Sequence, residues 1–198
     1  MRKGPCLFFS GRFKKGKPFP DPDAKIGYCA AKKQAFVGYR ATLLVESSYM
    51  PLLAYHVTPA NCHDSSALLP VLLSLEQHEL LCRLKSFHGD HAYFTAANLK
   101  WLAFHEIQCE FHSKEESGKH PKKKRGAKRK ARIRSKIEAV FGIMEENYHF
   151  GRTLVRGGEK VKGEMGLKVS AWNLFYLLSH VEGRFEDRIS LRRLFHEN

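Results

Sequence analysis

The chain of 198 residues lacks several features that would assign it to common classes of protein. No apolar run approaches the roughly 20 residues of a membrane-spanning helix, and the N-terminus has no apolar stretch typical of a signal peptide. Its five cysteines are scattered, and no two form a Cys-x-x-Cys pair, so a disulfide framework or a compact zinc site is not indicated. These absences predict a reduced cytoplasmic protein without a membrane segment.

Acidic residues are absent from residues 119–136, a segment that contains 11 of the 34 Lys and Arg side chains. The other 180 residues carry 23 basic and 20 acidic side chains, so most of the net charge of +14 comes from this basic block. Closely spaced cations repel one another, and a polyanion such as DNA relieves the repulsion. A nuclear localisation patch has a similar composition. The candidate DNA-binding residues are Lys122, Lys123, Lys124, Arg125, Lys128, Arg129, Lys130, Arg132 and Arg134.

A hydrophobic content of 43% is enough for the core of one domain. Residues 1–33 are rich in Gly, Pro and Lys, and we expect them to be irregular. Two β-branched and aromatic runs, 35–45 and 52–58, predict a β-hairpin. The elements expected next are a helix containing Leu68, Leu69, Leu72 and Leu75, a strand over 84–89, a helix over 95–105, a strand over 107–111, an amphipathic helix from near Arg132 and a helix over 166–181.

This alternation of strands and helices predicts a single α/β domain over residues 34–182, with a basic loop at 119–132. A charged C-terminal tail is expected at 183–198, and Gly157, Gly158 and Gly163 are expected to form a linker. Thr95 can cap the helix that follows it. For Asp64, capping of the helix that follows it is favoured over support of a functional site.

Two acidic residues are candidates for phosphate chemistry. Asp90 lies where a strand is expected to end, and ligands of open α/β sheets collect at the carboxyl ends of strands. Glu138 follows the basic block on an expected helix, one turn after Arg134. Considered alone, Asp90 could serve only to form a turn, and Glu138 could be one partner of a surface ion pair. Together they fit a site for Mg²⁺ or Mn²⁺ in phosphoryl transfer, with a third acid expected from a neighbouring strand.

Five segments follow one another along the chain: DPDAK at 21–25, FVGYRA at 36–41, VTPANCHDS at 57–65, GDHAY at 89–93 and FGRTLVRG at 150–157. In this order they resemble motifs of the DDE transposases of bacterial insertion sequences, and VTPANCHDS is the most specific of them. The resemblance covers about residues 21–180. It implies a ribonuclease-H-like mixed sheet flanked by helices, in which Asp90 is the second catalytic Asp and Glu138 is the catalytic Glu. Both would bind the metal ion.

The sequence also departs from this family. The resemblance implies a first catalytic Asp on an upstream central strand, but no acid precedes Asp21, and Asp21 and Asp23 fall on the entry motif. Ala131, Glu145 and His91 stand where the family often has Tyr, Lys and Lys. We therefore expect a chain truncated before the first central strand. A homo-oligomer or a second chain would supply what is missing.

Three functions follow from these observations. The leading hypothesis is a transposase catalytic domain that binds DNA and performs metal-dependent strand cleavage and transfer, inactive if it is truncated. The alternative is a non-catalytic nucleic-acid-binding remnant of a transposase. A third hypothesis is a metal-dependent nuclease unrelated to transposition. A nicking assay that requires a divalent metal separates the first two, and strand joining after cleavage separates the first from the third.

Overall fold

The computed structural model describes most of the chain. Side chains are described for most of these residues. The described residues are 6–9, 20–29, 33–112, 124–181 and 183. The expected C-terminal tail at 183–198 lies almost entirely outside them, and so do Lys122 and Lys123. No helix in these segments has the length and apolar character needed to cross a lipid bilayer.

The main sheet is built around the long strand β3 (Gln34–Val45). β3 forms the predicted antiparallel hairpin with β4 (Leu52–Pro59). It also pairs antiparallel with β2 (Lys25–Cys29) and with β1 (Cys6–Phe9). The short strand β7 (Arg152–Thr153) lies parallel to β1 and completes the five-stranded sheet. The β-branched and aromatic pattern of 35–45 therefore predicted the centre of the fold correctly.

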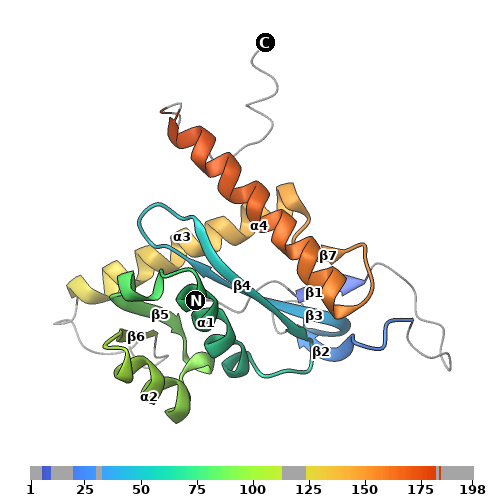
Figure 1. The fold of residues 1–198 in the computed structure, drawn as a ribbon, viewed down its shortest axis with the longest axis horizontal. Coiled ribbons are helices and arrows are strands. Elements are labelled where there is room, and N and C mark those ends of the chain that lie inside the picture. The colour runs from blue at the N-terminus through green and yellow to red at the C-terminus, as the bar shows by residue number, and fades with distance from the viewer. Residues whose placement is uncertain (1–5, 10–19, 30–32, 113–123, 182, 184–198) are drawn as a thin grey trace.

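The remaining strands and helices surround this sheet (Figure 1). Strands β5 (Ser86–Asp90) and β6 (Gln108–His112) form a separate parallel pair. The α-helices are α1 (Leu68–Gln77), α2 (Ala96–Phe104), α3 (Lys124–Tyr148) and α4 (Gly158–Val181). The short 3₁₀ helices are η1 (Asp64–Ala67), η2 (Leu81–Arg83) and η3 (His91–Tyr93). The predicted mixed α/β class is confirmed.

The two faces of β3 are covered by different helices, because side chains alternate along a strand. Tyr39, Ala41 and Leu43 are buried in a core that includes residues of α3 and α4. Leu44 belongs to a second core, together with residues of α1 and α2. Arg40 and Thr42 share the face of Leu44 by the same alternation. This face is the one on which the candidate site is built.

The N-terminal expectation is wrong in part, because β1 and β2 lie within the segment expected to be irregular. Neither strand has a strong pattern of its own, and both are ordered through pairing with β3. Tertiary pairing of this kind overrides weak local propensity.

Two helices start earlier than expected. α3 begins at Lys124 rather than near Arg132, so part of the expected basic loop is helical. Lys, Arg and Ala are good helix formers, and their propensity outweighs the mutual repulsion of the cations. α4 begins at Gly158, so Gly158 and Gly163 are helical instead of forming a linker.

Candidate active site

The candidate site begins at the carboxyl end of β5, which Asp90 ends as predicted. The Asp90 carboxylate accepts the backbone N–H of His91 through Oδ1 at 2.8 Å and thereby caps η3. Tyr93, the last residue of η3, is completely buried beneath this turn. The Asp90 side chain is therefore fixed by its own turn at a partly exposed position.

The buried Tyr93 hydroxyl is influenced by the charges of two acidic residues, Asp64 and Asp90. Burial raises the pKa of Tyr93, a hydrogen bond with the Thr42 side chain opposes the rise, and the charges of Asp64 and Asp90 reinforce it. The positive charge of Arg40 lowers the pKa of Tyr93. The hydrogen bond between Tyr93 and Thr42 links η3 to β3, and the charges of Asp64, Asp90 and Arg40 all act on this phenol.

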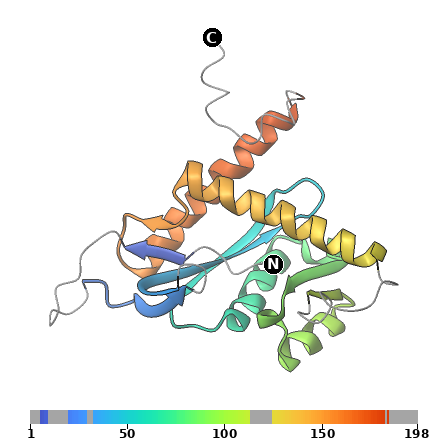
Figure 2. The same ribbon diagram turned by 180° about the vertical axis from the view of Figure 1, so that it is seen from behind.

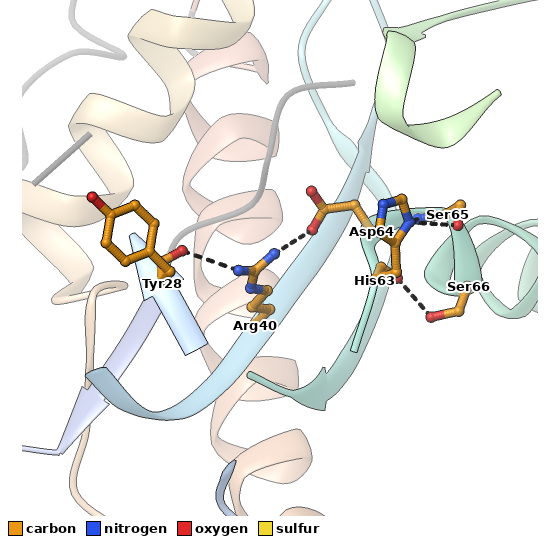
Figure 3. A network of polar contacts seen from close by, with 6 residues as sticks. All are labelled: Tyr28, Arg40, His63, Asp64, Ser65 and Ser66. Atoms are coloured by element: carbon orange, nitrogen blue, oxygen red, sulfur yellow. Dashed lines mark hydrogen bonds and ion pairs between the residues drawn. The ribbon is translucent and has the colours of Figure 1, made fainter. Parts of the chain in front are cut away.

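Arg40 and Asp64 form a half-buried ion pair at this point (Figure 3). The Arg40 Nη1 donates to Asp64 Oδ1 at 2.8 Å, and its Nη2 donates to the Tyr28 carbonyl at 3.1 Å. The two side chains are 18% and 10% exposed, so the pair is largely removed from solvent. Asp64 is therefore a partner of Arg40.

The favoured interpretation of Asp64 as a helix cap is wrong. The cap of η1 is His63, whose Nδ1 accepts the backbone N–H of Ser65 at 3.3 Å. The His63 carbonyl also accepts the Ser66 hydroxyl at 2.7 Å (Figure 3). The Asp64 side chain is therefore not used in capping and faces β3. Side chains alternate between the two faces of a strand, and Arg40 lies on the face of β3 that is turned toward Asp64.

Asn98 joins the turn of Asp64 to the turn of Asp90. Its amide Nδ2 donates to the Ser65 carbonyl at 3.0 Å and to the Tyr93 carbonyl at 2.6 Å. Thr95 caps α2 by accepting the Asn98 backbone N–H, as predicted. Neither Asn98 nor Arg40 was among the candidate site residues. A polar amide in the first turn of a mostly apolar helix was the available signal for Asn98.

Glu138 lies on α3, whose apolar residues Ile137, Val140 and Met144 are buried as their spacing predicted. The Arg134 Nε donates to Glu138 Oε1 at 2.9 Å, one helical turn away. These side chains are 56% and 36% exposed, so solvent screens the pair strongly. The contact holds the carboxylate in place and contributes little to stability.

A cavity of about 550 Å³ separates β3 from β5. Its walls include residues 43–48 of β3 and the following turn, residues 84–88 leading into β5, and Ile133 and Ile137 of α3. Asp90 follows His88 by two positions, and Glu138 directly follows Ile137. The two acids therefore come from segments that border one cavity, although in the described part of the chain neither carboxylate lines it. Their convergence on a shared ion stays a prediction.

The edge of β3 beside this cavity is only partly paired. Tyr39 pairs with Pro59 of β4 and also with Leu7 of β1, so these two strands lie on opposite edges of β3. β1 reaches no further than Arg40, whereas β4 continues to Val45. Within the segments that the structure covers, the β1 edge of residues 41–45 therefore has no partner strand.

The described carboxylates do not complete a metal site. No group of three or more His, Cys, Asp and Glu side chains gathers there in a way that could hold a metal ion. Carboxylate oxygens such as those of Asp90 and Glu138 suit Mg²⁺ or Mn²⁺, and two carboxylates would need at least one further oxygen ligand to bind such an ion firmly.

Asp21 and Asp23, the acids nearest the N-terminus, are engaged elsewhere. Asp21 is buried, and its Oδ2 accepts the Tyr39 hydroxyl at 3.0 Å and the Gly157 N–H at 2.8 Å. Asp23 Oδ2 accepts the Gly158 N–H at 2.9 Å. Both carboxylates lie at the N-terminus of α4, where exposed N–H groups favour an anion. Their contacts identify them as structural residues of this helix start.

The candidate DNA-binding residues are concentrated on one helix. Lys124, Arg125, Lys128, Arg129 and Lys130 occupy the first turns of α3. Arg132 and Arg134 follow on the same helix, and both are exposed. The helix that carries Glu138 therefore also carries most of the described part of the basic block.

The chain thus combines an α/β domain, an aspartate at a strand end and a helix that carries a glutamate and many Lys and Arg residues, which are residue types suited to a protein that acts on nucleic-acid phosphates. The family model for the transposase DDE domain matches residues 11–174, and the chain belongs to this family. Membership indicates a role in DNA transposition with DNA as the partner, and such transposases typically use a divalent metal ion. No curated protein and no solved structure matches the chain.

Proposed function

We propose that this chain is a transposase catalytic domain of ribonuclease-H-like fold, in which Asp90 and Glu138 contribute two of the catalytic carboxylates. The observation that carries the proposal is the cavity between β3 and β5, because the segments bearing both acids border it. Membership of the transposase DDE domain family supports the same assignment of the reaction. The reaction is hydrolysis of a DNA strand, followed by attack of the freed 3′-hydroxyl on a second DNA.

The basic residues of α3 bind DNA phosphates without reading the base sequence. Arg132 and Arg134 are exposed on α3, and the cations that precede them extend the same helix toward its N-terminus. Contacts from Lys and Arg to phosphates position a duplex and make its affinity depend on salt. Because Glu138 lies on this helix, a strand held by these cations passes close to the proposed catalytic acids.

Asp90 and Glu138 would hold Mg²⁺ or Mn²⁺ through carboxylate oxygens. When bound, such an ion stabilises the charge that develops on the attacking and leaving oxygens of a phosphodiester. The role of this chain's residues is positional. The His91 N–H fixes one oxygen of Asp90, and Arg134 fixes one oxygen of Glu138.

The missing ligand is proposed to come from an extended strand in the cavity. One wall includes residues 43–45 of β3, whose edge on the β1 side has no partner strand among the described residues, and the opposite wall includes residues 84–88. Adjacent strands lie about 4.8 Å apart, so one strand between these walls could pair with both. Antiparallel pairing with β3 would continue the direction of β1. Another segment of the polypeptide or a second chain would supply this strand and its acid.

The proposed function is tested with supercoiled plasmid nicking in Mg²⁺ or Mn²⁺. Asp90→Asn keeps an acceptor for the His91 N–H and removes the charge, and Glu138→Gln is the corresponding change on α3. Each should reduce nicking by at least about a hundredfold while DNA binding is retained. Glu76→Gln and Glu146→Gln change exposed acids on α1 and α3 and serve as matched controls. Equal nicking by Asp90→Asn and the unaltered chain would refute the catalytic assignment.

The second candidate function is a nucleic-acid-binding domain without catalysis. It is favoured by the incomplete ligand set, since the described side chains include no three-residue metal group. Salt-sensitive DNA binding without nicking at any divalent metal concentration would support it. A nuclease unrelated to transposition differs in one further result, because it would cut DNA without joining the 3′-hydroxyl to another strand.

A further inference from the structure

The position of Asp90 relative to the main sheet does not come from strand pairing. Among the described residues, β5 pairs only with β6, and these two strands form a sheet of their own. Figures 1 and 2 show β5, β6 and α2 grouped together at one end of the molecule, beside α1. Other contacts must therefore set where the Asp90 carboxylate lies with respect to β3.

The turn that carries Asp90 is too short to hold its own orientation. η3 has only three residues, and it is closed by the Phe94 N–H, which donates to the His91 carbonyl at 3.1 Å. Hydrogen bonds in short 3₁₀ helices have poorer geometry than those in α-helices. Because Asp90 Oδ1 accepts the His91 N–H, any movement of this turn moves the carboxylate with it.

Asn98 fixes the turn through both N–H groups of its side-chain amide. One group donates to the Tyr93 carbonyl at 2.6 Å, and the other donates to the Ser65 carbonyl at 3.0 Å. Asn98 is only 3% exposed, so water does not compete for these bonds. A neutral amide supplies two donors from one nitrogen, which a hydroxyl, a carboxylate or an apolar side chain cannot do.

The other end of this bridge is held to the main sheet. Ser65 belongs to η1, and Asp64, which precedes it, accepts a hydrogen bond from Arg40 of β3 at 2.8 Å. Asn98 itself is anchored by α2, in which Leu102 is completely buried one turn further on. The contacts therefore run without a break from β3 through η1 and Asn98 to the turn of Asp90.

A second link joins the same turn directly to β3. The Tyr93 side chain makes a hydrogen bond with Thr42 of β3, while the Tyr93 carbonyl accepts the Asn98 amide. One link of this kind would leave η3 free to rotate about it. Two links at different points of η3 remove that rotation, so the Asn98 bridge is needed to define the direction of the Asp90 carboxylate.

We propose that Asn98 is a positioning residue of the reaction, which orients the Asp90 carboxylate by tying η3 to η1. Asn98 is buried and acts through the backbone of Tyr93 and Ser65. The inference rests on the proposed function, in which Asp90 is a catalytic carboxylate. Residues that orient a carboxylate from behind typically change metal affinity or activity by about 10- to 100-fold when they are replaced.

The first test is plasmid nicking across a range of Mn²⁺ concentrations by the unaltered chain, Asn98→Ala and Asn98→Leu. Both variants lack the two donors, and Leu keeps a side chain of similar size where Ala leaves a cavity. In each, the half-saturating Mn²⁺ concentration should rise, or the rate at saturating Mn²⁺ should fall, by about 10- to 100-fold. DNA affinity without metal should not change, because α3 is unaltered.

Hydrogen exchange of the metal-free chain gives a readout that does not depend on activity. The N–H groups of His91 and Phe94 are bonded within the Asp90 turn, so their exchange reports local opening of η3. NMR should show that both amides exchange at least about tenfold faster in the two Asn98 variants than in the unaltered chain.

Asn173→Ala is the matched control. The Asn173 amide also bridges backbone groups, since its Oδ1 accepts the Leu52 N–H at 2.9 Å and its Nδ2 donates to the Leu52 carbonyl at 2.8 Å. These bonds join α4 to β4, away from η3. Their loss should lower the Tm without altering the Mn²⁺ dependence or the exchange of His91 and Phe94.

The outcomes separate this inference from the proposed function. If Asp90→Asn is inactive while the Asn98 variants nick like the unaltered chain, the positioning role is overturned and the proposed function stands. Equal changes in the Asn98 and Asn173 variants would show a general loss of rigidity and would also overturn the positioning role. If the unaltered chain does not nick, or nicks no faster than Asp90→Asn, the proposed function fails and the positioning role fails with it.

Discussion

At the scale of single residues, the ion pair of Arg40 and Asp64 ties the candidate site to the main sheet. Arg40 comes from β3, and its guanidinium bonds both the Asp64 carboxylate and the Tyr28 carbonyl. Both charges are largely buried, so each depends on the other for compensation. Removal of one partner is therefore expected to cost far more than removal of both.

Asp64→Ala should lower the free energy of unfolding by about 3–5 kcal/mol, because it leaves the Arg40 charge buried without its partner. The double variant Arg40→Met/Asp64→Leu should lose clearly less. Urea denaturation of both variants measures the difference. Arg134→Ala, which breaks the exposed pair with Glu138, is the control and should change stability by about 1 kcal/mol or less. A small loss for Asp64→Ala would mean that Arg40 finds another partner or water.

The Asp90 and Glu138 predictions show how far single residues could be interpreted from sequence. The strand end at Asp90 and the Thr95 cap both follow from local pattern, and both are confirmed. The pairing of Arg40 with Asp64 joins residues 24 positions apart. It depends on which face of β3 meets η1, and a single sequence does not define that contact.

At the scale of whole elements, the entry motif and α4 form one structural unit. Asp21 accepts hydrogen bonds from Gly157, 136 positions away, and from Tyr39 of β3. Gly157 has a φ of +89°, a conformation that favours glycine, and its N–H points to the carboxylate. Asp21 thus holds together β3 and the start of α4.

Asp21→Asn should destabilise the fold by about 2–4 kcal/mol at neutral pH, because it weakens charged hydrogen bonds in a buried setting. Burial raises the pKa of Asp21, but the hydrogen bonds from Gly157, Tyr39 and Asp23 lower it by more, so the folded-state pKa lies below 3.8. The ionised form is therefore favoured by folding. Its contribution is complete above pH 3.8 and is lost as the pH falls through the folded-state pKa.

Thermal unfolding of the Asp21→Asn variant and the unaltered chain at several pH values tests this sign. The variant should melt below the unaltered chain by a constant difference in Tm between about pH 5 and pH 8, and this difference should shrink below pH 3.8. A difference in Tm that grows as the pH falls would contradict the proposed role of the carboxylate. Asp23, whose carboxylate binds the Gly158 N–H, offers a comparison at the same helix start.

Elements with a strong local pattern were predictable, and elements ordered by distant partners were not. The hairpin of β3 and β4, the apolar positions of α3 and the strand before Asp90 follow directly from periodicity. The strands β1 and β2 gain their order from pairing with β3. The first turns of α4 contain Gly158 and Gly163, which weaken a helix signal, and contacts such as that of Asp23 stabilise them.

At the scale of the whole molecule, charged residues are distributed unevenly over the helices. The basic block lies on and before α3, whereas the last thirteen residues of α4 carry no Asp, Glu, Lys or Arg. Polyanions should therefore bind at α3, and their binding should depend strongly on salt.

DNA affinity should fall steeply with salt, with a logarithmic slope that reports the number of neutralised phosphates at about 0.9 per contact. Arg132→Gln combined with Arg134→Gln should reduce that slope by about 1.8 and weaken binding similarly for unrelated DNA sequences. Lys100→Gln, a change of an exposed cation on α2, should leave the slope unchanged. Fluorescence anisotropy of labelled duplexes between about 50 mM and about 200 mM salt measures these slopes. If the Lys100 and α3 variants lost affinity equally, the DNA contact would be a general effect of the net charge of +14 rather than a property of α3.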